Sequence, residues 1–217
     1  MGGALAMTIW LAPFSAGGTA AHCPNQVAQL YASGVATPSG SANAVKAVIP
    51  WTDPNVCSQS VSHSIDIVNG LGWVQVGWWK ASGSSVRGYC EVQNPNNSNY
   101  QFLDFSITAA SHAYNWTYDS VDGYWDCILD SSAMLSKTSG WVGFTSGTLI
   151  DVQGEAKGQH VQIGKMAPGA LLFSGMQYRQ TSSGSWLLVD VTAGSPPSPY
   201  GIADPGPGKL QVWTNAH

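Results

Sequence analysis

Charged side chains are scarce in this sequence. Only 9% of its 217 residues are Asp, Glu, Lys or Arg, whereas an average globular domain has roughly 25%. The formal net charge is -4, and no cluster of Lys or Arg is present to neutralise phosphate groups. We therefore expect no nucleic acid among the partners.

Long apolar runs are missing as well. No stretch reaches the roughly 18 apolar residues that a membrane-spanning helix requires, so we expect no membrane span. Residues 1–22 instead resemble a signal peptide, because residues 4–14 form a short apolar core and residues 18–21 are small enough for a cleavage site. A buried N-terminal strand is the alternative interpretation of residues 1–22.

The cysteines contain no closely spaced pair of the kind that zinc sites use. No Asp-x-Asp-x-Asp loop for calcium is present either, so we expect neither a metal nor a cofactor. The four cysteines allow three disulfide pairings. We favour Cys23–Cys57 in the N-terminal region and Cys90–Cys127 on core-facing strand positions. Disulfides indicate an oxidising compartment, so we predict a secreted protein.

Helical periodicity is absent from residues 60–192, and residues 23–34 could make one short helix. From residue 62 onward, short runs rich in Val, Ile, Tyr, Trp and Phe alternate with Gly, Asn and Ser, which predicts strands joined by turns. The predicted strands cover residues 62–68, 72–79, 87–93, 100–107, 112–119, 124–130, 140–144, 147–155, 158–164, 170–179, 185–192 and 209–214.

So many strands predict an all-β fold, a two-sheet antiparallel β-sandwich of the jelly-roll type that covers residues 62–217. Residues 23–61 are expected to form a loop-rich N-terminal region. Residues 195–208 are too rich in proline for a central strand, and we expect them to cross the surface before a last edge strand.

One face of the predicted sheet is polar and aromatic, while the other is apolar. In residues 72–79, for example, Val74 and Val76 alternate with Trp73 and Gln75. The side chains assigned to the polar face are Trp73, Gln75, Trp79, Tyr89, Glu91, Gln93, Asp104, Asp151, Gln153, Glu155, His160 and Gln162. Aromatic rings stack on sugars or peptide side chains, and amides supply directional hydrogen bonds. We therefore predict a groove that binds a polymer.

The segments 72–77, 89–91 and 151–155 resemble, in their order and composition, strands of the glutamic peptidases. This resemblance implies a secreted β-sandwich of concanavalin A-like form that hydrolyses polypeptides. It also implies that Gln75 and Glu155 are the catalytic pair. Glu91, which is assigned to the same face, is the reserve acid. Such a pair is chemically sensible, because a carboxylate can take the proton of an attacking water and an amide can donate to the oxyanion that develops.

Two alternatives use the same polar face with a polysaccharide as the ligand. The first is a carbohydrate-binding module or lectin without catalysis, which ten Trp and the low charge would suit. The second is a glycoside hydrolase, because Asp151, Gln153 and Glu155 have the spacing of the Glu-x-Asp-x-Glu strand that jelly-roll enzymes of the laminarinase type carry. Two of those three positions differ in this sequence, so we place this alternative below the peptidase.

Overall fold

The computed structural model of the protein describes residues 30–54, 56, 59–96, 100–135, 142–157, 163 and 171–215. Within these residues every regular element is a strand, which confirms the all-β prediction. The strands are β1 (Leu30–Ala36), β2 (Ala44–Ile49), β3 (Ser60–Asn69), β4 (Gly72–Ala81), β5 (Arg87–Gln93), β6 (Tyr100–Ser106), β7 (His112–Asp119), β8 (Tyr124–Leu129), β9 (Ser132–Leu135), β10 (Leu149–Lys157), β11 (Leu171–Arg179), β12 (Leu187–Leu188), β13 (Thr192–Ala193), β14 (Tyr200–Ala203) and β15 (Leu210–Thr214). No helix within the described ranges is long and apolar enough to cross a membrane.

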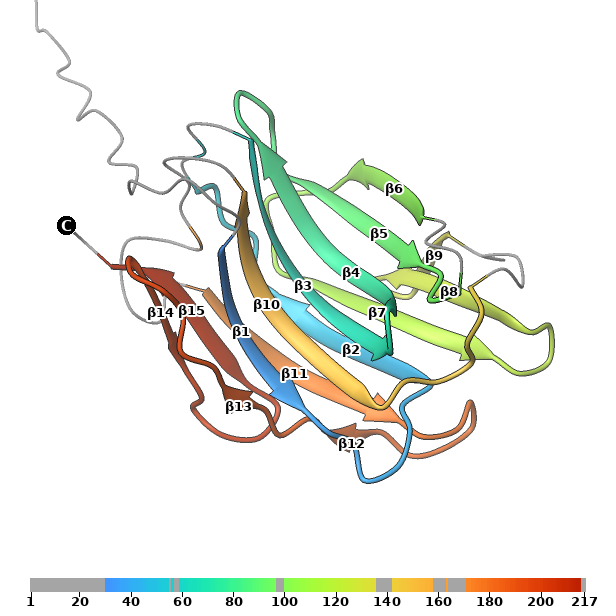
Figure 1. Cartoon of the computed structure of the whole chain (residues 1–217). Coiled ribbons are helices and arrows are strands. Elements are labelled where there is room, and N and C mark those ends of the chain that lie inside the picture. The colour runs from blue at the N-terminus through green and yellow to red at the C-terminus, as the bar shows by residue number, and fades with distance from the viewer. Residues whose placement is uncertain are drawn as a thin grey trace, which may run out of the picture.

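The strands form two curved antiparallel sheets that lie one over the other (Figure 1). The seven-stranded sheet has the order β13-β1-β10-β3-β4-β5-β6. The eight-stranded sheet has the order β14-β15-β11-β2-β7-β8-β9, with β12 paired to β11. The predicted two-sheet sandwich is therefore confirmed.

The core lies between the sheets and is built by strict alternation along the strands. On β4, Val74, Val76 and Trp78 have no exposed surface and face the eight-stranded sheet. Burial of such side chains away from water is the main force that holds the two layers together. The opposite face of β4 is left for the polar and aromatic residues, as the sequence predicted.

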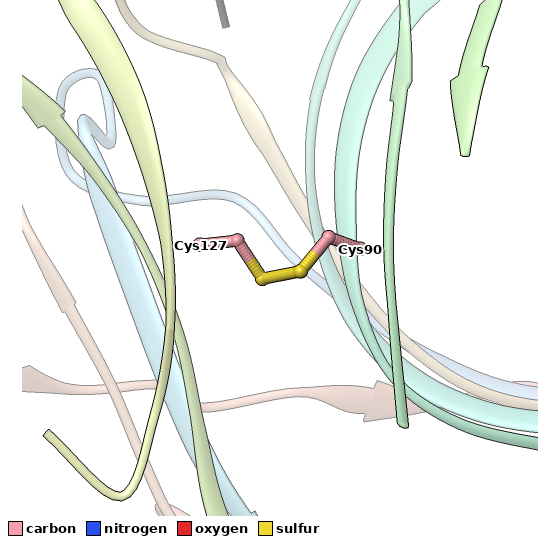
Figure 2. The surroundings of a disulfide bond; sticks show 2 residues. All are labelled: Cys90 and Cys127. Atoms are coloured by element: carbon pink, nitrogen blue, oxygen red, sulfur yellow. A yellow bond between two sulfur atoms is a disulfide. The ribbon is translucent and has the colours of Figure 1, made fainter. Parts of the chain in front are cut away.

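A disulfide between Cys90 on β5 and Cys127 on β8 ties the two sheets together (Figure 2). Their Cα atoms lie 6.2 Å apart, within the usual range for this bond. This confirms one of the two predicted pairs. Cys23 and Cys57, the other predicted pair, lie outside the described residues.

The N-terminal part of the sandwich differs from the sequence-based expectation. Residues 23–61, expected to be loop-rich, contribute β1 to the seven-stranded sheet and β2 to the eight-stranded sheet. The short helix expected over residues 23–34 is wrong for its described part, because residues 30–34 belong to β1. In β1 the inward positions hold Ala32 and Gly34, small residues that give little of the apolar alternation by which a strand is recognised.

Several later boundaries also differ. Residues 142–144, expected to be part of a strand, lie in a loop, and residues 158–162 lie outside the described part. The strand expected over residues 185–192 is replaced by β12 and β13, which pair with different sheets. The last strand, β15, is not at an edge, because β14 pairs with its outer side. The prolines at 196, 197 and 199 precede β14, so they do not interrupt its pairing.

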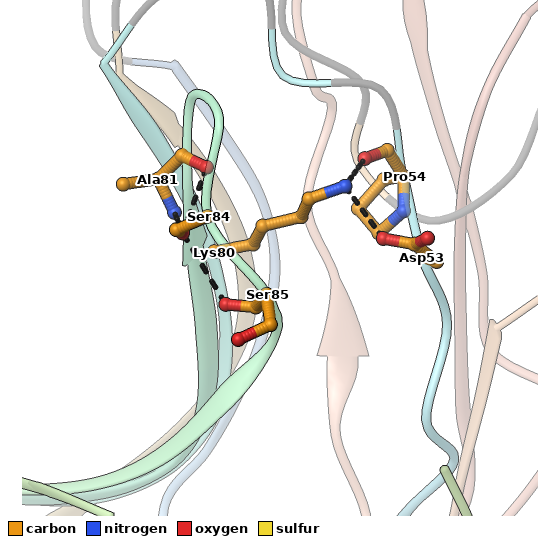
Figure 3. Close-up of polar contacts among 6 residues, drawn as sticks. All are labelled: Asp53, Pro54, Lys80, Ala81, Ser84 and Ser85. Atoms are coloured by element: carbon orange, nitrogen blue, oxygen red, sulfur yellow. Dashed lines mark hydrogen bonds and ion pairs between the residues drawn. The ribbon is translucent and has the colours of Figure 1, made fainter. Parts of the chain in front are cut away.

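The loop after β2 is fixed to the far end of β4 by one lysine (Figure 3). The Lys80 Nζ atom donates to Asp53 Oδ1 at 2.5 Å and to the Pro54 carbonyl at 2.9 Å. At the same end, the Ser84 hydroxyl closes the turn between β4 and β5 by bonding with the backbone of Ala81. These contacts fix the chain around the end of β4 in the seven-stranded sheet.

Candidate active site

A cleft of about 550 Å³ opens on the outer face of the seven-stranded sheet, the face turned away from the core. Its walls come from β1, β10, β3, β4 and β5. The lining residues are Tyr31, Ser33, Asp66, Val68, Trp73, Gln75, Glu91, Asp151, Gln153, Glu155 and Lys157. Six residues of the predicted polar face, Trp73, Gln75, Glu91, Asp151, Gln153 and Glu155, are therefore brought together in one cleft.

The other predicted residues do not line this cleft. Tyr89 is buried under the ring of Phe102, with the two centroids 5.6 Å apart, and Trp79 meets the same Phe102 ring edge-on at 5.8 Å. Gln93 donates to the neighbouring Asn94 carbonyl. Asp104 forms an ion pair with Arg87. His160 and Gln162 lie outside the described residues.

Sequence reasoning missed the acid at the centre of the cleft, Asp66 on β3. A signal for it existed, because Ser64 and Asp66 alternate with the apolar Ile65 and Ile67, just as the residues of β4 alternate. Tyr31 and Ser33 were missed for a different reason, since β1 was not recognised as a strand.

The strand register places four of these side chains in one row across the sheet. Asp151 on β10 is opposite Asp66 on β3, Asp66 is opposite Gln75 on β4, and Gln75 is opposite Glu91 on β5. Directly opposed residues of antiparallel strands have Cβ atoms about 5 Å apart. Glu155 is in another row, opposite Ser62.

Asp66 is the hub of the hydrogen bonds in this row. Its Oδ2 atom accepts from Gln75 Nε2 at 3.1 Å and from Gln153 Nε2 at 3.0 Å. Gln75 Nε2 also donates to Ser64 Oγ at 2.8 Å, so both of its hydrogens are engaged. Asp66 is only 4% exposed and Gln75 only 6%. The amides are therefore held in place by the acid that they surround.

The two glutamates of the cleft have hydrogen-bond or ion-pair partners of their own. Glu155 Oε2 accepts from Ser62 Oγ at 3.1 Å, and Glu155 Oε1 lies 3.5 Å from Lys157 Nζ. Glu91 Oε1 accepts from Trp73 Nε1 at 3.3 Å. Each of the two Glu side chains is thus oriented by a neighbouring side chain.

The electrostatics of the row favour protonated acids. Burial, followed by the charge of Asp151, raises the pKa of Asp66 well above its ordinary value. Burial raises the pKa of Asp151 to about 6, and burial also raises the pKa of Glu91. Desolvation disfavours the charged form of a carboxyl, and a second carboxylate nearby disfavours it further. Such perturbed acids in a cleft are typical of functional sites.

No group of three or more His, Cys, Asp or Glu side chains among the described residues has an arrangement that could hold a metal ion. The side chains that line the cleft offer carboxyls, amides, hydroxyls, one amine and aromatic rings.

The fold and the cleft together define a class, a two-sheet antiparallel β-sandwich with buried acids and amides on the outer face of one sheet. Two peptidases of known structure share this fold. Scytalido-glutamic peptidase, solved with a peptide-based transition-state analogue, matches with a TM-score of 0.65 at 11% identity, over 87% of this chain and 100% of that chain. SCP-B, a member of the eqolisin family of peptidases solved with the tripeptide Ala-Ile-His, matches with a TM-score of 0.61 at 9% identity and the same coverage.

At this level of identity the likeness shows the fold, and it confirms the structural resemblance to glutamic peptidases that the sequence predicted. A prokaryotic β-1,3-1,4-glucanase (lichenase) derived from a mouse hindgut metagenome is less similar, with a TM-score of 0.40 at 12% identity over 60% of this chain and 67% of that chain. No protein-family model and no curated protein matches the sequence.

Proposed function

We propose that this protein is a hydrolase that cleaves polypeptides in its acidic cleft. The observation that carries the proposal is that the Gln75 amide and two carboxyls of β10, Asp151 and Glu155, line one cleft. Peptide hydrolysis can use such a set, because a carboxylate accepts the proton of the attacking water and an amide donates to the oxyanion. The shared fold of the two peptidases supports a polypeptide as the substrate class.

Two carboxyls of β10 are candidates for the general base. The sequence analysis assigns this role to Glu155, and that assignment stays a prediction. The register favours Asp151, which is in the row of Gln75, whereas Glu155 lies four residues further along β10, about 13 Å away along an extended strand. We therefore give the base role to Asp151, and a substrate-binding role to Glu155.

In the proposed reaction, the Asp151 carboxylate takes a proton from water while the water oxygen attacks the carbonyl carbon of the scissile bond. The carbonyl oxygen becomes an oxyanion and accepts a hydrogen bond from Gln75 Nε2, which exchanges its bond to Ser64 for the substrate. The carbon–nitrogen bond then breaks, and Asp151 returns the proton to the leaving amine. The products are one carboxylic acid and one amine, so the reaction consumes one water.

The test is hydrolysis of a denatured protein such as casein across the acid range, by the wild type and three variants. Asp151→Asn should lower kcat about 100-fold or more, the usual contribution of a general base. Gln75→Ala should lower kcat with little change in KM, since the amide acts on the transition state. Glu155→Gln should mainly raise KM.

Matched controls for these variants are Asp104→Asn and Gln93→Ala, which remove an acid and an amide outside the cleft. Both should keep wild-type turnover. A wild type that turns over no polypeptide at any pH would contradict the proposed function. Loss of kcat in Glu155→Gln with full kcat in Asp151→Asn would return the base role to Glu155.

A second candidate function, binding of a polysaccharide, is favoured by the aromatic rings beside the cleft. Tyr100 and Phe102 on β6 are stacked with their planes 9° apart, and both remain exposed. Flat exposed rings of this kind bind sugar faces. If the wild type binds insoluble polysaccharide without turnover of protein, and Trp73→Ala weakens this binding, this function replaces the peptidase.

We also propose that the protein is exported and that residues 1–22 act as its signal segment. The Cys90–Cys127 bridge supports export, because disulfides persist mainly in oxidising compartments. The mass of the protein recovered outside the producing cell tests this proposal, since removal of the segment would shorten the chain.

A further inference from the structure

We infer that Asp66 and Asp151 act as one unit, a pair of facing carboxyls that holds a single proton between β3 and β10 and supplies both the base and the acid of the reaction. The sharing of the proton is supported by the geometry of the two side chains and by the groups around them. The catalytic use of the pair rests on the proposed function.

The first support is the register. Asp66 and Asp151 are directly opposite each other on neighbouring antiparallel strands, and both line the cleft. Their Cβ atoms are therefore about 5 Å apart, which brings two short carboxyl side chains on the same face within reach of one hydrogen. Two ionised carboxylates at such a separation repel each other strongly where water is excluded.

The second support is the hydrogen bonding of the carboxyl oxygens. Asp66 Oδ2 accepts from the amides of Gln75 and Gln153. The other oxygen of each acid, Oδ1, is buried and has no hydrogen-bond partner among the described residues, in Asp66 and in Asp151 alike. Buried polar atoms without a partner are rare and costly. A single hydrogen between the two Oδ1 atoms would satisfy both at once.

The third support is the charge around the pair. Asp151, Glu91 and Glu155 each act to raise the pKa of Asp66, while a hydrogen bond from Ser64 acts in the opposite direction. The groups that face the pair are Tyr31 on β1, Glu155 and Lys157 on β10, Ser64 on β3, Gln75 on β4, and Tyr89 and Glu91 on β5. Lys157 lies 3.5 Å from Glu155, which it partly neutralises. The balance of charges around Asp66 and Asp151 favours a pair that keeps one proton.

The pair gives the reaction an acid that Asp151 alone lacks. With the shared proton on Asp66, the Asp151 carboxylate takes one hydrogen from the attacking water. Asp66 gives its proton to the carbonyl oxygen as that oxygen gains the electron pair of the broken π bond. When the carbon–nitrogen bond breaks, Asp151 protonates the leaving amine and Asp66 recovers its proton from the hydroxyl of the intermediate. The pair ends each cycle with the one proton it began with.

The test is a titration of the side-chain carboxyl carbons of the intact protein by NMR, with aspartate labelled with carbon-13. In the wild type, the pair should titrate in two steps, one near the pKa of about 6 to which burial raises Asp151 and a high step above it. In Asp66→Asn the high step should disappear, and the Asp151 step should fall because the new amide donates to Asp151 and brings no charge. Asp104→Asn, an acid on the same sheet outside the cleft, should leave both steps unchanged.

Two results would overturn the inference. One is a wild type whose aspartates all titrate in the ordinary carboxyl range. The other is an Asp66→Asn protein that keeps the high step unchanged. The wild-type titration decides the matter even if Asp66→Asn fails to fold, and Asp151→Asn provides the reciprocal variant.

Activity separates the two proposals. If the high step is present but no polypeptide is cleaved, the proton-sharing pair stands and the proposed function fails. If polypeptides are cleaved, Asp66→Asn and Asp151→Asn should each lower kcat about 100-fold or more. Full kcat in Asp66→Asn would refute the catalytic use of the pair and leave the proposed function in place.

Discussion

Each face of β3 carries one buried titratable group, and the two groups differ in their hydrogen-bond partners. His63 faces the core, where its ring stacks on Trp78 at 4.3 Å and neither ring nitrogen has a hydrogen-bond partner among the described residues. Asp66, three residues further on, faces the cleft and accepts from two amides. Both are buried, but only the cleft residue has partners aimed at its ionisable atoms. Burial alone therefore does not mark a functional residue, whereas burial with dedicated polar partners does.

The two residues also respond to pH with opposite signs. Burial lowers the pKa of His63 to about 3 from the ordinary 6.5. Below pH 6.5 the unfolded chain binds a proton at this histidine that the folded chain does not bind. The stability of the folded chain therefore falls as the pH drops from 6.5 towards 3. Burial raises the pKa of Asp151 to about 6 from 3.8, so the folded chain keeps a proton that the unfolded chain loses, and stability falls as the pH rises from 3.8 towards 6.

The largest effect is expected in the free energy of unfolding, in which substitutions of two tryptophans of β4 should differ. Trp78 is fully buried in the core and donates to the Pro50 carbonyl at 3.1 Å. Trp78→Ala should lower the free energy of unfolding by about 3 to 5 kcal/mol, as large-to-small core changes do. Trp73 lines the cleft, and Trp73→Ala should cost about 1 kcal/mol or less. Urea unfolding of both variants checks this, and equal losses would mean that the two faces of β4 are not distinct.

The next effect concerns the stability of the protein when His63, on the core face of β3, is replaced. His63→Leu removes a buried base and leaves an apolar side chain in an apolar site. At pH 4 the variant should be more stable than the wild type by about 3 kcal/mol, since each unit of pKa shift corresponds to about 1.4 kcal/mol. At pH 7 the two should differ little. Unfolding at both pH values provides the measurement, and a pH-independent difference would show that His63 acts through packing rather than through its proton.

A smaller effect is expected when Asp66, on the cleft face of β3, is replaced. Asp66→Asn should raise the free energy of unfolding at pH 7, because it removes a carboxyl whose pKa burial and the charge of Asp151 raise well above its ordinary value. At pH 4, where the wild-type pair is protonated, the gain should vanish. Asp104→Asn serves as the control for the loss of one acid, because Asp104 forms an ion pair with Arg87 outside the cleft. A variant that is less stable than the wild type at pH 7 would contradict the opposition of the two acids.

Much of this arrangement could be predicted from the sequence because β4, β5 and β10 alternate strictly. Alternation alone put Gln75, Glu91 and Gln153 on one face, and in the structure these three side chains line one cleft. β1 escaped prediction because its inward residues, Ala32 and Gly34, are small. The pairing of Asp66 with Asp151 could not have been predicted, since the register between strands far apart in the chain is set only by the folded sheet.

In the proposed site, the row from Asp151 through Asp66 to Gln75 works only while the pair of acids holds one proton. The pH dependence of kcat/KM for cleavage of a polypeptide reports on this protonation state. We predict that kcat/KM rises as Asp151 ionises near pH 6, the value to which burial raises its pKa, and falls at higher pH once Asp66 also loses its proton. Full activity at pH 4, where Asp151 is protonated, would show that Asp151 is not the base.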